Sequence, residues 1–287
     1  MPRGALSRRL FTLVVGAALL GSISQCRSKA KPSENTADAP SAAQSAEPPR
    51  PLVVFAAASL RDVFGPLGKS FEAAYPGTVV TFHFAGTQEL RTQLEQGAKA
   101  DVFASADQRH MKALLDAQLV VHPRIFAHNE PVLVVSKEAA GTVQSFADLP
   151  KATRVVVGAP EVPIGAYTRQ ILELAGRKLG AEFLTQVEAH VVSRELNVRQ
   201  VLTKVSLGEA QAGIVYRSDV ASAKGTVSVV AIPSELNVVA DYPIAFVAAS
   251  KEPEFASEFM NLVTSPKGQA ALRAAGFSLD SGSAPKP

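Results

Sequence analysis

Four strand-to-helix junctions combine small, hydroxyl and proline residues in a way that could bind an anion. The first ends in Ser59 and the second contains Thr87, so each places a hydroxyl where a helix is predicted to begin. In the third, Pro163 suits the first helical position, and the N–H of Ile164 is left free. The first turn of a helix carries unpaired N–H groups and a partial positive charge, which together suit an anion. Taken singly, each junction is explained equally well by ordinary capping.

The fourth junction joins the segment around Val198 to an apolar strand that ends at Tyr216. The hydroxyl of Tyr216 could project into a cleft as a donor, or the ring could simply pack at the rim of the core. Arg199 lies four residues after Glu195, and we expect these two side chains to form a structural ion pair. Asp62, three residues after Ser59, could similarly complete a capping interaction.

The elements that must position these residues alternate between strands and helices. The apolar run 52–58 is typical of a strand buried on both faces. Further strands are predicted at 79–84, 101–104, 132–135, 155–157, 188–192, 212–216, 227–232 and 244–248. Helices are predicted at 60–75, 88–96, 164–179, 198–207, 253–263 and 266–275. This alternation favours mostly parallel sheets with helices on both faces, where ligands bind beyond the carboxyl ends of the strands.

Length and composition predict an α/β protein of two lobes. The chain has 287 residues, of which 47% are hydrophobic and 19% charged, as in ordinary globular domains. The chain is expected to cross between the lobes near Pro131 and near Asp241. The predicted division is lobe 1 at 51–131 and 241–280, lobe 2 at 132–240 and a disordered tail at 281–287.

The N-terminal segment predicts export from the cytoplasm. Residues 1–26 combine a basic start with a short apolar core, as in a signal peptide, and the Arg8-Arg9 pair resembles a twin-arginine signal. The lone cysteine, Cys26, follows this core in a context that resembles a lipoprotein lipidation site; the alternative is an incidental thiol in a peptide that is removed. Residues 27–50 are rich in Ala, Ser, Pro, Glu and Lys, which predicts a flexible tether.

Composition and spacing argue against several classes of function. The net charge of +3 owes much to the N-terminal segment, and no basic run alternates with aromatic residues, so nucleic-acid binding is not supported. A single cysteine excludes an intramolecular disulfide framework. The five histidines have no metal-ligand spacing, and Ser59 lacks the G-x-S-x-G context of a hydrolase nucleophile. We therefore expect neither an enzyme nor a directly coordinated metal.

Five ordered motifs resemble the periplasmic molybdate-binding protein family over about residues 52–279. They are 55–60 (FAAASL), 97–107 (GAKADVFASAD), 162–167 (VPIGAY), 197–199 (NVR) and 213–219 (GIVYRSD). The resemblance implies a two-lobed periplasmic-binding-protein fold, type II-like, with the ligand in the cleft between the lobes. In that family the oxyanion is held without counter-charges, by serine hydroxyls, backbone amides and a tyrosine hydroxyl.

Carried over to this chain, the resemblance assigns five oxyanion-binding residues: Ser59, Thr87, Ile164, Val198 and Tyr216. Ser59 would donate from its side chain and its backbone, and Tyr216 from its hydroxyl. Thr87 stands where the family usually has serine, so the hydroxyl is kept. Ile164 stands where a small residue is usual, but only its backbone amide would be needed, as for Val198.

The resemblance also implies the biological role. The protein would capture molybdate, and also tungstate, in the periplasm or cell envelope and deliver it to an ABC permease and its ATPase. It would act as a monomer without a cofactor, held at the membrane by a lipid on Cys26. The alternatives are a binding protein of the same fold for sulfate or phosphate, and a sensory lipoprotein that takes no part in transport.

Overall fold

The computed structural model describes residues 50–279, which belong to one compact unit containing two five-stranded sheets. The predicted signal peptide, Cys26 and the predicted tail lie outside the described residues, as does the predicted tether except Arg50, which begins the first strand. Within residues 50–279, no helix has both the length and the apolar composition needed to cross a bilayer.

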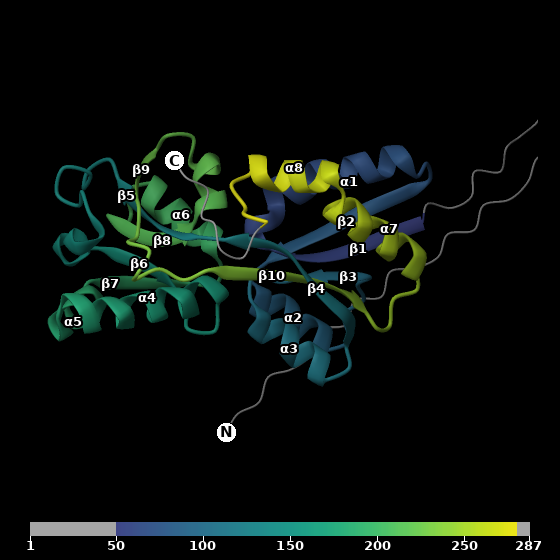
Figure 1. Ribbon diagram of the computed structural model, residues 1–287, viewed down its shortest axis with the longest axis horizontal. Helices are drawn as coiled ribbons and strands as arrows, with labels where there is room; N and C mark the ends of the chain where they lie inside the picture. Colours follow the sequence, from purple (N-terminus) through teal and green to yellow (C-terminus); the bar gives the residue numbers. More distant parts are fainter. Residues whose placement is uncertain (1–49, 280–287) are drawn as a thin grey trace, which may run out of the picture. The chain divides into compact units, whose positions relative to one another are not determined.

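The first lobe is built on a sheet with strand order β2-β1-β3-β10-β4. Its strands are β1 (Arg50–Ala57), β2 (Thr78–Ala85), β3 (Val102–Ala104), β4 (Val120–Asn129) and β10 (Ala240–Val247). Helices α1 (Arg61–Ala74), α7 (Pro253–Thr264) and α8 (Pro266–Ala274) cover one face, and α2 (Thr87–Glu95) and α3 (Gln108–Asp116) cover the other (Figure 1). A short 3₁₀ helix, η1 (Ala58–Leu60), links β1 to α1.

The second lobe repeats this plan on a sheet with strand order β7-β6-β8-β5-β9. Its strands are β5 (Pro131–Ser136), β6 (Val155–Gly158), β7 (Val191–Glu195), β8 (Ala212–Tyr216) and β9 (Val227–Val230). Helix α6 (Val198–Ser206) packs on one face and α4 (Pro163–Leu179) on the other, with α5 (Ala181–Ala189) beside α4 (Figure 1). The 3₁₀ helices η2 (Phe146–Lys151) and η3 (Arg217–Ala223) complete the lobe.

Both sheets are mostly parallel, as predicted, but each contains one strand that runs against the others. In the first sheet β10 runs antiparallel to β3 and β4, and in the second β5 runs antiparallel to β8 and β9. Strands β5 and β10 are the two that follow a crossing from the other lobe. A strand that enters a sheet from the end where the parallel strands finish must run against them. The prediction of mostly parallel sheets is therefore confirmed, and the one antiparallel strand of each sheet is the strand that follows a crossing.

The continuous apolar runs form buried central strands, as predicted. Every residue of β5, β6 and β8 is buried, which explains why these strands show no alternation of polar and apolar residues. The first lobe adds an aromatic cluster between sheet and helices, in which the Phe64 and Phe259 rings meet edge to face with their centroids 5.7 Å apart. Buried residues of both lobes belong to one large hydrophobic cluster, which supports the strand ends beside the site.

Three elements differ from the prediction. The predicted strand 188–192 is wrong at its start, because residues up to Ala189 belong to α5, where Phe183 and Val187 are buried one helical turn apart. Helix α3 and strand β4 were not predicted. Strand β4 contains Pro123, and His122 has a φ of 52°, so its sequence lacks the alternation that indicates a strand.

Candidate functional site

The five residues predicted to bind an oxyanion line one cavity. Its lining also includes backbone-rich stretches at the ends of β1 and β2 and at the starts of α4 and α6. The cavity measures about 20 Å³, on a scale where roughly 10–15 Å³ holds one water molecule. Two grooves elsewhere measure about 700 and 790 Å³. In this conformation the cavity therefore suits an ion of a few atoms and excludes a sugar or a peptide.

The first lobe contributes side-chain hydroxyls, from Ser59 and Thr87, which we call the first wall. Ser59 follows β1 in the 3₁₀ helix η1 and is 3% exposed; its Oγ lies 2.9 Å from the hydroxyl oxygen of Tyr242. Thr87 begins α2 and is 1% exposed; its Oγ1 accepts a hydrogen bond from the Ala106 N–H at 3.2 Å. The Thr87 proton is thus free to point into the cavity.

The predicted capping role of Ser59 is wrong. The 3₁₀ turn inserts Leu60 as the N-cap of α1, and no side chain caps that helix. Asp62 does not return to Ser59 but forms an ion pair with Arg199 of the second lobe at 2.8 Å. Ser59 is therefore released from helix capping and bonds to Tyr242 instead.

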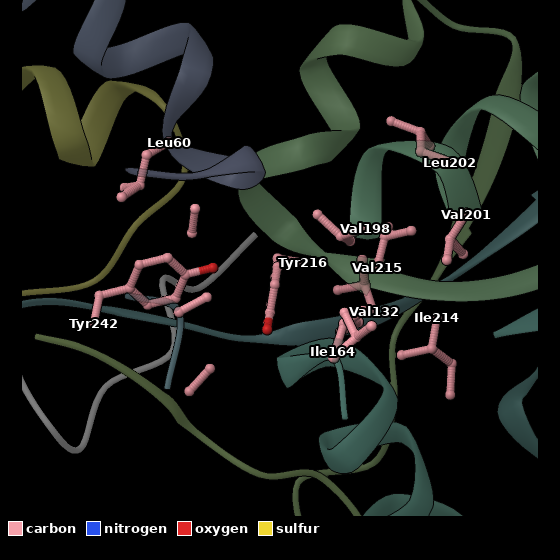
Figure 2. Close-up of a cluster of buried hydrophobic side chains, with 14 of the residues drawn as sticks. Leu60, Val132, Ile164, Val198, Val201, Leu202, Ile214, Val215, Tyr216 and Tyr242 are labelled. Carbon is pink, nitrogen blue, oxygen red and sulfur yellow. The ribbon is translucent and has the colours of Figure 1, made fainter. Parts of the chain in front are cut away.

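The second lobe contributes backbone amides and one phenol, from Ile164, Val198 and Tyr216, which we call the second wall. Ile164 is the second residue of α4 and Val198 the first residue of α6, so neither N–H has a partner within its helix. The Ile164 side chain is 1% exposed and belongs to the hydrophobic core, so only its backbone serves the cavity (Figure 2). Its size is thus accommodated away from the site.

Close packing of glycines holds the start of α4 against the end of β6. A Cβ built on Gly165 would collide with the backbone oxygens of Ala159 and Gly158. A side chain at position 165 would therefore push the helix away from the strand and displace the Ile164 amide. Gly165 is needed for this close approach, not for an unusual backbone angle.

Tyr216 carries the one hydroxyl at the cavity with no hydrogen-bond partner within residues 50–279. The side chain is 1% exposed, stands at the end of β8 and lies beside Tyr242, with ring centroids 5.7 Å apart (Figure 2). Burial raises the pKa of Tyr216 well above its usual range, so the hydroxyl stays protonated. A buried donor without a partner is costly, which points to a ligand as its acceptor.

The side chains that line the cavity carry no charge. Side-chain hydroxyls and backbone N–H groups around it offer mainly hydrogen-bond donors. Asn197 could accept, but its Oδ1 already takes the Gln200 N–H at 3.2 Å. Within residues 50–279, no group of three or more His, Cys, Asp or Glu could hold a metal ion. The chemistry on offer is therefore donation to an anion.

The structure contradicts the predicted Arg199–Glu195 ion pair. Arg199 instead bridges Asp62 of the first lobe and Asp219 of the second, each at 2.8 Å. Glu195 pairs with Lys204 at 2.7 Å. Glu195 ends β7, and the chain turns before α6 begins, so the helical spacing that the prediction assumed does not apply.

Further contacts that join the lobes were not predicted from the sequence. Gln88 Nε2 donates to the Leu196 carbonyl oxygen at 2.7 Å. Arg109 donates to the Glu161 carbonyl oxygen at 2.7 Å, and His110 Nε2 lies 2.8 Å from the same oxygen. Burial lowers the pKa of His110, so its neutral ring donates from Nε2. These contacts join residues that lie far apart in the sequence, so no local pattern marks them.

Known proteins resemble this chain in both sequence and fold. A model of the bacterial extracellular solute-binding protein family matches residues 52–278. The molybdate-binding protein ModA of Mycobacterium tuberculosis is 40% identical over 267 residues, which cover 92% of this chain and 94% of that protein. The periplasmic molybdate-binding protein of Azotobacter vinelandii has a TM-score of 0.69 at 21% identity, covering 80% of this chain and 99% of that one.

A protein with a different ligand shares the same fold. The sulfate-binding protein SubI of Mycobacterium tuberculosis has a TM-score of 0.71 at 18% identity, covering 79% of this chain and 86% of that one. At such identities, the two structural matches show the two-lobed fold and nothing finer.

Proposed function

The chain belongs to the bacterial extracellular solute-binding proteins, and we propose that it captures molybdate and delivers it to an ABC importer. The observation that carries the proposal is the Tyr216 hydroxyl, which is buried at the cavity and has no partner within the described residues. It faces the same cavity as Ser59, Thr87 and two helix starts. A small, fully deprotonated oxyanion would give every one of these donors an acceptor.

The absence of charged side chains from the lining is compatible with a dianion. A buried charge without hydrogen bonds would be prohibitively costly. Each hydrogen bond to a charged acceptor contributes roughly 1.5–3 kcal/mol, so several fixed donors can offset much of that cost. Since the donors are built into helix starts and buried hydroxyls, little is lost in ordering them when the ligand binds.

We propose molybdate rather than another tetrahedral dianion because of the proteins that this chain resembles in sequence. The ModA protein of Mycobacterium tuberculosis is named for molybdate binding and is 40% identical over almost the whole chain. Tungstate is nearly isosteric with molybdate, so we propose that it binds as well. Sulfate is smaller, and the cavity would select against it by size once the lobes close.

Delivery would follow capture in the closed form. We propose that the two lobes rotate about the crossings after β4 and β9, close on the ligand and dock on a membrane permease served by an ATPase. Cys26 would carry a lipid that holds the body at the outer face of the membrane, with the tether between them.

Thermal unfolding of the full chain against a panel of oxyanions tests the ligand. At about 1,000 times its Kd, a true ligand should add roughly 4 kcal/mol to the free energy of unfolding. We expect this shift with molybdate and tungstate and a much smaller one with sulfate or phosphate. A shift with sulfate or phosphate but none with molybdate or tungstate would refute the proposed specificity.

Tyr216→Phe provides the matched variant for the panel. Loss of one donor to a charged ligand should weaken molybdate binding about tenfold or more. Without ligand, the variant should be as stable as the wild type or more stable, because the hydroxyl that it loses is buried without a partner. Unchanged molybdate affinity in this variant would remove Tyr216 from the site.

A further inference from the structure

A chain of hydrogen bonds behind the first wall determines which way the Ser59 proton points. We propose that Tyr242, oriented by Asn129, is a positioning residue that directs the Ser59 hydroxyl proton into the cavity, so that the site rejects oxyanions carrying a proton. This inference rests on the proposed function, because it assumes that an oxyanion occupies the cavity. Neither Tyr242 nor Asn129 lines the cavity, so both would act through Ser59.

The direction of the chain is set at Asn129. The Glu130 N–H donates to Asn129 Oδ1 at 3.0 Å, which fixes the orientation of the side-chain amide. Its Nδ2 therefore turns the other way, donating to Ser218 Oγ at 2.8 Å and facing the Tyr242 hydroxyl oxygen at 3.5 Å. The contact with Tyr242 is too long to be a strong hydrogen bond. Its importance is that the group facing Tyr242 is a donor and not an acceptor.

The Tyr242 hydroxyl must then donate to Ser59. The tyrosine is fully buried, and its oxygen lies 2.9 Å from Ser59 Oγ. Of the two hydrogen-bond partners that the described residues give this hydroxyl, the Asn129 Nδ2 group cannot accept, whereas Ser59 Oγ can. Burial raises the pKa of Tyr242 well above its usual range, so the proton remains on the phenol at physiological pH.

The Ser59 hydroxyl has one proton to donate, and one lone pair of its oxygen already accepts the hydrogen bond from Tyr242. A serine hydroxyl donates once, so a bond from Tyr242 leaves its proton for the cavity. Thr87 shows the same arrangement with a different partner, because its Oγ1 accepts from the Ala106 N–H at 3.2 Å. Both hydroxyls of the first wall are thereby turned into donors toward the ligand.

This arrangement has a consequence for ligand choice. Molybdate and sulfate at neutral pH carry no proton, whereas monohydrogen phosphate carries one that needs an acceptor. A Ser59 hydroxyl relieved of its bond from Tyr242 could rotate and accept that proton. Removing the Tyr242 hydroxyl should therefore weaken the binding of molybdate and narrow the preference for molybdate over phosphate.

A double-mutant cycle measured by calorimetry tests the inference on the full chain. Molybdate and phosphate would be titrated at mildly alkaline pH into the wild type, Tyr242→Phe, Ser59→Ala and the double variant. We expect Tyr242→Phe to weaken molybdate binding about fivefold to tenfold in the wild type, but less than about twofold in the Ser59→Ala background. The ratio of the phosphate Kd to the molybdate Kd should fall in Tyr242→Phe.

Two further variants separate positioning from packing. Tyr75→Phe removes a tyrosine hydroxyl that bonds to Glu258 Oε2 at 3.1 Å on the surface, and it should leave both affinities unchanged. Asn129→Asp replaces the donor that faces Tyr242 with an acceptor of nearly the same shape. Tyr242 would then donate to position 129, so molybdate affinity should fall even though both hydroxyls remain, and this variant serves if Tyr242→Phe does not fold.

Two results together would overturn the inference and leave Tyr242 a packing residue. One is that Tyr242→Phe weakens molybdate binding equally in the wild type and in the Ser59→Ala background. The other is that the ratio of the phosphate Kd to the molybdate Kd does not change. A wild type that binds sulfate rather than molybdate would refute the proposed function, and the same cycle would then be measured with sulfate against phosphate. A wild type that binds no tetrahedral oxyanion would overturn both.

Discussion

The two walls of the cavity hold their donors in different ways. The first wall uses side-chain hydroxyls, each oriented by a neighbour behind it. The second wall uses backbone amides at the starts of α4 and α6, with Tyr216 as its one side-chain donor. Substitution of a side chain can therefore remove a donor from the first wall, whereas most substitutions in the second wall leave the amide in place.

The walls also differ in how they are braced. Behind the first wall lie two neutral side chains, Asn129 and Tyr242, the second of which bonds to Ser59. Behind the second lies a buried charge, Asp219, whose Oδ2 accepts the Tyr216 N–H at 3.2 Å while Arg199 lies 2.8 Å from its Oδ1. Neutral hydroxyls do not titrate near neutral pH, but a buried carboxylate does. The first wall should thus be insensitive to pH and the second sensitive.

The largest effect should come from removing an amide of the second wall. Val198 is the first residue of α6, where proline is well tolerated, and Asn197 before it has an extended backbone (φ −158°, ψ 165°) that a following proline allows. Val198→Pro should therefore keep the fold, lose one N–H donor and weaken molybdate binding about tenfold to a hundredfold in calorimetry.

Val198→Ala is the matched control because it keeps the N–H. It should cost about 1–2 kcal/mol of stability by opening space in the core. Its affinity should stay within about threefold of the wild type, since the side chain is not the donor. Equal losses of affinity in the two variants would show that the Val198 side chain, not its amide, serves the ligand.

Sequence patterns predicted this second wall better than the first. Pro163 at the start of α4 and the apolar run that ends at Tyr216 are local signals, and the structure has both elements where they were expected. The brace behind Ser59 has no local signal, because Tyr242 lies 183 positions further along the chain. The contact from Gln88 to Leu196 spans 108 positions. Pairings of this kind are set by how the lobes meet, which periodicity does not encode.

The sequence did not predict the direction of β5 and β10 or the true partners of Arg199, and the reason is the same in both cases. Alternation of strands and helices describes each βαβ unit but not the direction of β5 and β10, which follow the crossings between lobes. Spacing of four residues describes a continuous helix but not a chain that turns between Glu195 and Arg199. In both cases the local rule is sound, and the tertiary connection decides the outcome.

A smaller effect should come from crowding the place where the two walls meet. Gly86 has an extended backbone (φ −60°, ψ 140°) open to any residue, but an added Cβ would collide with the Leu196 carbonyl oxygen of the second lobe and with the Gln88 amide. Gly86→Ala should therefore hinder closure without disturbing either lobe. We expect molybdate affinity to fall about tenfold, with the thermal stability of the ligand-free protein nearly unchanged.

Two variants sharpen the interpretation of Gly86→Ala. Gly65→Ala adds a methyl to α1 where no atom lies within 4 Å, so it should leave affinity unchanged and slightly raise stability. Gln88→Ala removes the bond to Leu196 but adds no clash, and should cost less affinity than Gly86→Ala. If Gly86→Ala binds molybdate as tightly as Gly65→Ala, closure does not bring the two walls as near as the contact between Gln88 and Leu196 indicates.

The smallest effect on binding, and the clearest on pH dependence, should come from the brace of the second wall. Burial raises the pKa of Asp219 to about 6 despite the neighbouring Arg199. The folded protein therefore holds this proton at a pH where the unfolded chain has released it, since an unperturbed aspartate has a pKa of roughly 3.9. Asp219 therefore contributes fully to the free energy of unfolding below about pH 4, and this contribution is lost as the pH rises through about 6.

Asp219→Asn isolates this contribution, because it keeps an oxygen acceptor for the Tyr216 N–H and cannot titrate. Denaturant unfolding of both proteins from pH 4 to 7 should show the wild type losing on the order of 2–3 kcal/mol relative to the variant as the pH rises. Molybdate affinity at a fixed neutral pH should change little, since Asp219 does not line the cavity. A difference in unfolding free energy that stays constant across this range would mean that Arg199 fully offsets the burial of Asp219, and that the two walls do not differ in pH sensitivity.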